Sequence, residues 1–165
     1  MKHRANTTLV TPPIYKSNLR RFLLELGATE LVTLTSTRDM SLSEFDFCLW
    51  KASRRVYEKV LRRSKFAGQR TDSLFCFIAF FERTAVGIPH YHLAVRTDAA
   101  LRQVVYETFE AAWRQRFPPS DTVHVRSFGA GAIEYLLKDV ARSDDHLHAC
   151  TTSWLLLPLY CKPAR

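Results

Sequence analysis

The sequence has no long hydrophobic segment. Its longest apolar runs, Leu74 to Phe81 and Trp154 to Tyr160, are only as long as a strand, whereas a membrane-spanning helix needs about 20 apolar residues. We therefore expect no transmembrane span and no membrane partner. No apolar region follows the basic residues at positions 2–4, so we also expect no signal peptide.

Several common binding motifs are also absent. The four cysteines form no CxxC pair, which argues against a zinc ribbon or a thiol redox motif. The sequence contains neither GxGxxG nor GxxxxGK, so neither dinucleotide binding nor a P-loop is indicated. Because Cys48 and Cys76 lie in apolar patterns, we predict reduced core thiols. This predicts a reduced, cytoplasmic compartment.

Positive charge is in excess. Lysine and arginine number 24 against 16 acidic residues, a formal net charge of +8, which favours nucleic acid as a partner. A membrane surface ranks second and is not expected, because no strongly amphipathic terminal helix stands out. One predicted helix, which begins after Ser41, carries a basic ridge in its second half and beyond. The ridge consists of Arg54, Arg55, Lys59, Arg62, Arg63 and Lys65. We interpret it either as a solvated face or as a set of phosphate contacts.

The length predicts one domain over residues 1–165. Residues 1–20, with Pro12-Pro13, look like an irregular arm. The β-branched and apolar patterns predict strands over 31–37, 74–82, 89–95 and 122–128, and another near 154–157. Helical periodicity is expected over 45–60, 101–112 and 133–140. The order β-α-β-β-α-β-α predicts an α+β fold, with a central antiparallel sheet and flanking helices.

One strand carries the triplet His90-Tyr91-His92. Side chains alternate along a strand, so His90 and His92 share a face and Tyr91 points to the other. A hairpin centred on Val86 places Glu82 opposite His90, and paired residues project from the same face. Two imidazoles and a carboxylate suit a divalent ion, Mg²⁺ or Mn²⁺, with zinc also allowed. The alternative is a chance His-x-His pair beside a strand that reaches solvent at Glu82.

The last predicted helix carries Tyr135 and Lys138 on one face, because they are three residues apart. A tyrosine hydroxyl can attack phosphorus and form a covalent phosphotyrosine. A neighbouring ammonium would favour the phenolate and offset charge on the phosphoryl group. The alternative for Tyr135 is packing at an interface, and for Lys138 a solvated tip.

Together these motifs resemble the HUH endonucleases, and within them the Rep-type initiators of rolling-circle replication. The chain has a Thr-containing strand from Leu31 to Ser36, then His90-Tyr91-His92 with Glu82 upstream, then Tyr135-x-x-Lys138. The match covers residues 29–142, which leaves the arm 1–20 and the tail 143–165 unassigned. The motif has a single tyrosine, so the chain resembles the two-tyrosine phage initiators poorly. Relaxases generally use three histidines, whereas the third ligand here is Glu82, which favours a Rep-type site.

The resemblance implies an enzyme that nicks and joins single-stranded DNA, often beside a hairpin at an origin, with a host helicase as a further partner. Glu82, His90 and His92 would hold the metal, Tyr135 would attack the scissile phosphate, and Lys138 would assist. The product is a 5′-phosphotyrosyl link and a free 3′-OH that primes replication. A single-strand DNA transposase of the same superfamily is an alternative.

Two further alternatives remain open. The same fold can serve as a non-catalytic nucleic-acid-binding module, or as an adaptor with an inactive site, although an inactive relative would be expected to lack at least one of the five motif residues. His146, His148 and Cys150 form a rival zinc set in the tail. His124 and Arg126 share a strand face and either approach the phosphate or form a surface pair.

Overall fold

The computed structural model describes residues 12–61, 75–83, 87–117, 123–138 and 150–152. The strands are β1 (Glu30–Thr35), β2 (Phe75–Arg83), β3 (Pro89–Thr97), β4 (Val123–Ser127) and β5 (Cys150–Thr152). The helices are α1 (Pro12–Leu26), α2 (Leu42–Leu61), α4 (Arg102–Arg114) and α5 (Ala130–Leu137).

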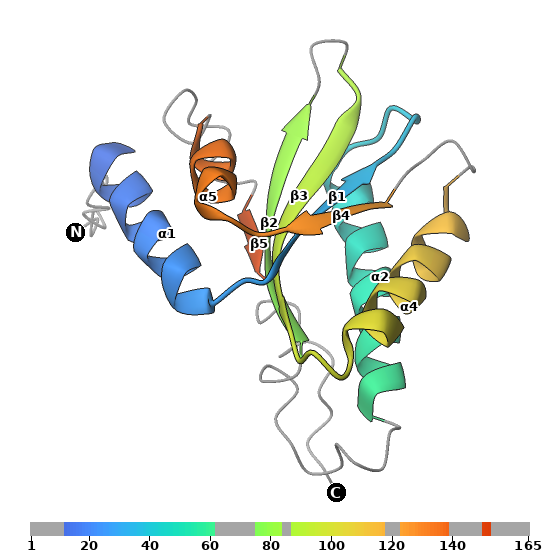
Figure 1. The fold of residues 1–165 in the computed structure, drawn as a ribbon. Helices are drawn as coiled ribbons and strands as arrows, with labels where there is room; N and C mark the ends of the chain where they lie inside the picture. The colour runs from blue at the N-terminus through green and yellow to red at the C-terminus, as the bar shows by residue number, and fades with distance from the viewer. Residues whose placement is uncertain (1–11, 62–74, 84–86, 118–122, 139–149, 153–165) are drawn as a thin grey trace, which may run out of the picture.

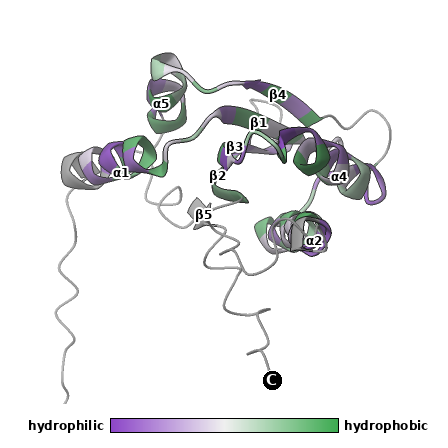
Figure 2. Cartoon of the chain, turned by 60° about the horizontal axis from the view of Figure 1, so that its bottom comes forward, coloured by the Kyte–Doolittle hydropathy of each residue, from purple (hydrophilic) through white to green (hydrophobic). Residues whose placement is uncertain are grey.

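The strands form one five-stranded sheet in the order β4-β1-β3-β2-β5. All neighbouring strands are antiparallel, and helices lie against both faces of the sheet (Figure 1). The predicted α+β class, with a central antiparallel sheet and flanking helices, is therefore confirmed. Figure 2 shows the same layers from another side, with α1 and α5 across the sheet from α2 and α4.

The layer formed by α2 and α4 covers the larger core. Phe45 of α2 is fully buried. Its ring stacks on that of Tyr91, with centroids 5.0 Å apart and an interplanar angle of 9°. Trp113 of α4 meets Phe45 edge-on at 5.3 Å. These aromatic contacts bury large apolar areas, so this face of the sheet carries much of the hydrophobic stabilisation.

The layer formed by α1 and α5 covers a smaller core. Leu19, Leu23 and Leu26 of α1 are buried with Ile133 and Leu136 of α5. They pack on the sheet residues Cys76, Ile78, Phe80 and Ala94. Since α1 contributes to this core, the packed unit begins before the predicted motif-bearing region of residues 29–142.

The predicted irregular arm over residues 1–20 is wrong for residues 12–20, which belong to α1. Pro12-Pro13 was interpreted as a sign of irregular structure, yet proline is favoured in the first turn of a helix, where its missing N–H is not needed. The helix ends before Gly27, whose φ of +63° suits the left-handed conformation common at helix ends. Residues 1–11 lie outside the described residues.

The predicted helix start after Ser41 is confirmed as a capping box. The Glu44 amide donates to Ser41 Oγ at 3.3 Å, and the Ser41 amide donates to Glu44 Oε2 at 2.9 Å. The Ser41 hydroxyl also donates to Glu44 Oε2 at 2.7 Å, and this bond, followed by the one from the Ser41 amide, lowers the pKa of the Glu44 carboxyl. Two of the amides that a helix N-terminus leaves without partners are satisfied in this way.

The tail contributes a strand at a different place from the one expected. Three residues, Cys150–Thr152, pair with the outer edge of β2, whereas the strand predicted near 154–157 lies outside the described residues. Cys48 and Cys76 are buried free thiols, as predicted. None of the described helices is long and apolar enough to cross a membrane.

Candidate active site

The hairpin of β2 and β3 brings together the three predicted metal ligands. In its register Glu82 pairs with His90, and Phe80 pairs with His92, which is the pairing that the sequence predicts. His90 and His92 are 8% and 5% exposed, and Tyr91 points into the opposite core. The cluster of Glu82, His90 and His92 therefore lies on the α1/α5 face of the sheet.

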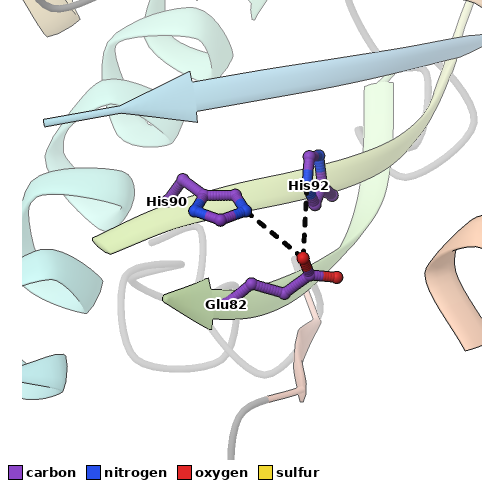
Figure 3. Close-up of side chains that lie close together, drawn as sticks. All are labelled: Glu82, His90 and His92. Atoms are coloured by element: carbon purple, nitrogen blue, oxygen red, sulfur yellow. Dashed lines mark hydrogen bonds and ion pairs between the residues drawn. The ribbon is translucent and has the colours of Figure 1, made fainter. Parts of the chain in front are cut away.

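A single carboxylate oxygen of Glu82 contacts both histidine side chains (Figure 3). Glu82 Oε2 lies 3.3 Å from His90 Nε2 and 3.6 Å from His92 Nε2. Burial alone would raise the pKa of Glu82, but the hydrogen bonds from His90 and His92 and the nearby charges of His92 and Lys138 lower it well below its usual value. Glu82 is therefore ionised at neutral pH.

The cluster has the chemistry of a divalent-metal site. One donor atom from each of the three residues lies within 4.8 Å of the other two, so one ion can contact all three after small side-chain movements. The buried His90 Nδ1 has no hydrogen-bond partner within the part of the chain that the structure describes. The nitrogen of His90 that faces Glu82 is Nε2, so this atom is the one placed to bind the ion. A carboxylate with two imidazoles leaves coordination positions for water or phosphate.

Thr33 on the neighbouring strand β1 fixes the orientation of His92. The two residues pair in register, and Thr33 Oγ1 lies 2.9 Å from His92 Nδ1. With Nδ1 held by the hydroxyl, Nε2 faces Glu82. Histidine ligands commonly use their second nitrogen in this way, which selects the tautomer and the ring position.

Helix α5 adds Tyr135 to the cluster. Ile133, Leu136 and Leu137 of this helix are buried against the sheet, which sets the position of the helix. The Tyr135 hydroxyl lies 3.0 Å from His92 Nε2, and the two rings meet edge-on at 4.9 Å. The hydroxyl is therefore next to the candidate metal ligands, and the Tyr135 side chain remains 40% exposed.

Lys138 follows the same helix and contacts both halves of the site. Its Nζ lies 3.4 Å from Glu82 Oε2 and 3.8 Å from the centroid of the Tyr135 ring. Burial lowers the pKa of Lys138, but the hydrogen bond to Tyr135 and the charge of Glu82 outweigh it, so the pKa is raised. The structure therefore brings all five predicted site residues together: Glu82, His90, His92, Tyr135 and Lys138.

The other tyrosine side chains that the structure describes lie on the opposite face. Tyr57 donates to the carbonyl of Phe75 at 3.0 Å, and Tyr91 donates to Asp46. Tyr106 donates to Glu30 at 2.8 Å, and burial together with this carboxylate raises the pKa of Tyr106. Among the described tyrosines, Tyr135 alone approaches the cluster.

The described part of the predicted basic ridge does not adjoin the cluster. Arg54, Arg55 and Lys59 lie on α2, on the far side of the sheet (Figure 1). Arg54 forms an ion pair with Glu58 at 2.8 Å, and Arg55 donates to Gln115. A role for these residues in DNA binding stays a prediction, on a surface separate from the site. Arg62, Arg63 and Lys65 lie outside the described residues.

The exposed strand β4 extends the cluster face. His124 pairs with Thr33, and Arg126 pairs with Leu31. Since Thr33 also pairs with His92, His124 lies in the same row across the sheet as His92. Arg126 lies on the same face, in the adjacent row that contains Leu31. The side chains of the rival set, His146, His148 and Cys150, lie outside the described residues.

The contact between Thr33 and His92 was not predicted from the sequence. The only signal in the sequence was the position of Thr33 in a predicted strand, two residues before Thr35. No local pattern indicates that this strand lies beside the strand of His92.

No family model matches the chain, and neither the curated proteins nor the solved structures include a match to it.

Proposed function

We propose that this protein is a metal-dependent endonuclease that nicks and joins single-stranded DNA through a phosphotyrosyl intermediate, as a Rep-type HUH enzyme does. One observation carries the proposal. The Tyr135 hydroxyl lies 3.0 Å from His92 Nε2, although the residues are 43 positions apart. A candidate nucleophile and a candidate metal site thus adjoin on the α1/α5 face of the sheet.

In the proposed reaction the Tyr135 oxygen attacks the scissile phosphorus. One P–O bond forms and the bond to the 3′ oxygen breaks, which leaves a 5′-phosphotyrosine and a free 3′-OH. The phenol loses a proton and the 3′ oxygen gains one, so the exchange is balanced. Because the phosphodiester is conserved in the protein link, a 3′-OH can reverse the step and join DNA.

The surrounding residues each support this step. Glu82, His90 and His92 would hold a divalent ion, Mg²⁺ or Mn²⁺, which supplies polarisation of a phosphate oxygen. The Lys138 ammonium, 3.8 Å from the Tyr135 ring centroid, stabilises negative charge that develops on the phenol and the phosphoryl group. The excess of eight positive charges favours binding of the polyanionic substrate.

The decisive experiment looks for a covalent adduct. The protein is incubated with labelled single-stranded DNA and Mn²⁺, and the mixture is run on a denaturing gel. We expect a labelled protein band that disappears in EDTA and in Tyr135→Phe, which removes one oxygen and little volume. Tyr106→Phe is the matched control, because its hydroxyl binds Glu30 on the opposite face, and it should retain the adduct.

The DNA sequences used should include random single strands and strands beside a hairpin, because the resemblance implies either substrate. An adduct that persists in Tyr135→Phe would refute Tyr135 as the nucleophile. Binding of DNA by every variant with no adduct under any metal would instead favour the non-catalytic binding module.

A further inference from the structure

The oxygen Glu82 Oε2 has a third contact besides the two imidazoles. Lys138 Nζ lies 3.4 Å from it, as close as His90 Nε2 at 3.3 Å and closer than His92 Nε2 at 3.6 Å. We propose that the Lys138 ammonium occupies the cation position of the metal-free site and competes with the divalent ion for Glu82. This inference rests on the metal site of the proposed function, and it concerns how that site is loaded.

The metal-free cluster needs a counter-charge. The Glu82 side chain is only 12% exposed, and a largely buried carboxylate is costly unless a donor or a cation compensates it. Lys138 supplies a full positive charge to the same oxygen that faces both histidines. The ammonium thus compensates the charge of Glu82, the carboxylate that faces both histidines, before an ion arrives.

The same position makes Lys138 an obstacle to the ion. A divalent cation bound by Glu82 Oε2 would repel an ammonium that remains in contact with this oxygen. Lys138 is 39% exposed and has a long flexible stem. It can therefore leave Glu82 without disturbing α5, which is held by buried Ile133, Leu136 and Leu137.

The released ammonium does not leave the site. Its contact with the Tyr135 ring, at 3.8 Å from the centroid, does not involve Glu82. Metal loading would therefore release the ammonium from the carboxylate and leave its positive charge beside Tyr135, the attacking residue of the proposed function. Lys138 then has opposite effects on two measurable quantities, since it weakens metal binding and accelerates nicking.

The test measures Mn²⁺ affinity without DNA, by calorimetry or by the electron paramagnetic resonance of free Mn²⁺. Lys138→Met, which keeps the aliphatic stem and removes the charge, should bind Mn²⁺ about fivefold more tightly, the equivalent of one partly exposed ion pair. Lys138→Gln is a second neutral variant with the same expectation. Lys138→Arg keeps a cation and should remain close to wild type.

Arg20→Met is the charge-matched control. Arg20 also lies in the α1/α5 layer, but it pairs with Glu134 at 2.5 Å and not with Glu82. Its removal lowers the net charge by the same amount and should leave the Mn²⁺ affinity unchanged. A rise in affinity in Arg20→Met equal to that in Lys138→Met would attribute the effect to overall charge and overturn the proposal.

Nicking at saturating Mn²⁺ completes the test. Lys138→Met should nick more slowly than wild type in spite of its tighter metal binding, whereas a merely structural lysine would weaken both. The proposal that Lys138 competes with the ion would be overturned if both neutral variants bound Mn²⁺ no more tightly than wild type while their thermal unfolding was unchanged. Tighter binding in these variants with no adduct in any protein would keep the competition and refute the nicking function. A wild-type chain that binds no Mn²⁺ would overturn both.

Discussion

The two faces of the sheet use the same strands for different purposes. On β3, Tyr91 is fully buried and stacks on Phe45 in the α2/α4 layer. His90 and His92, one residue away on either side, point to the α1/α5 layer and meet Glu82. The first face is packed around large aromatic side chains, while on the second the helix α5 brings Tyr135 and Lys138 to the candidate metal ligands.

The difference is clearest in the polar groups. Tyr57, Tyr91 and Tyr106 all donate to acceptors within the α2/α4 side, so their hydroxyls are occupied. Tyr135 lies 40% exposed on the other side and touches a carboxylate–histidine cluster through His92. Strand alternation thus separates the main packing face from the face that carries the candidate site, and the following substitutions test this separation.

The largest effect is expected for a carboxylate exchange on the cluster face. Glu82→Gln removes the charged ligand with little change in volume, and it should abolish measurable Mn²⁺ binding and adduct formation. Asp46→Asn is the matched exchange on the other face, because Asp46 accepts from Tyr91. Isothermal titration with Mn²⁺ should show full binding for Asp46→Asn, and loss in both variants would mean that the faces are not separate.

The next effect concerns the aromatic core. Phe45→Ala should lower the free energy of unfolding by about 3–5 kcal/mol, because it removes a fully buried ring and leaves a cavity. Phe47→Ala, two residues along α2 and 48% exposed, should change it by at most about 0.5 kcal/mol. Urea denaturation followed by circular dichroism measures both. Equal losses would contradict the assignment of the main core to this face.

A smaller effect is expected at the hydroxyl behind His92. Thr33→Val removes the partner of Nδ1 and should weaken Mn²⁺ binding about 10- to 100-fold, as for other residues that orient metal ligands. Thr33→Ser keeps the hydroxyl and should remain close to wild type. Thr108→Val is the control on the other face, since Thr108 Oγ1 is buried without a partner among the described residues. An affinity unchanged in Thr33→Val would show that Thr33 does not orient His92.

The smallest effect is expected at the start of α2. Ser41→Ala removes the capping hydroxyl that accepts from the Glu44 amide and should cost about 1 kcal/mol of unfolding free energy. Since α2 lies across the sheet from the cluster, the Mn²⁺ affinity of the folded protein should not change. A thermal melt and a Mn²⁺ titration of the same sample test both statements.

Much of the cluster was predictable because its contacts are local. Glu82 and His90 are eight residues apart, and a hairpin with a short turn sets their register. The shared face of His90 and His92 follows from the two-residue period of a strand. The first helix was missed because Pro12-Pro13 suggests irregular structure, although proline suits a first helical turn. The burial of Leu19, Leu23 and Leu26 against the sheet, which stabilises this helix, is visible only in the structure.

The sequence by itself determined which residues share a face, because backbone geometry imposes the periods of strands and helices. It thereby paired Glu82 with His90, and Tyr135 with Lys138. Only the tertiary structure decided that β1 lies beside β3, which brings Thr33 to His92, and that α5 covers this face, which brings Tyr135 to the same ring. These neighbours are 59 and 43 residues from His92 along the chain, and their placement depends on how two hydrophobic cores are buried at once, a property that no local pattern contains.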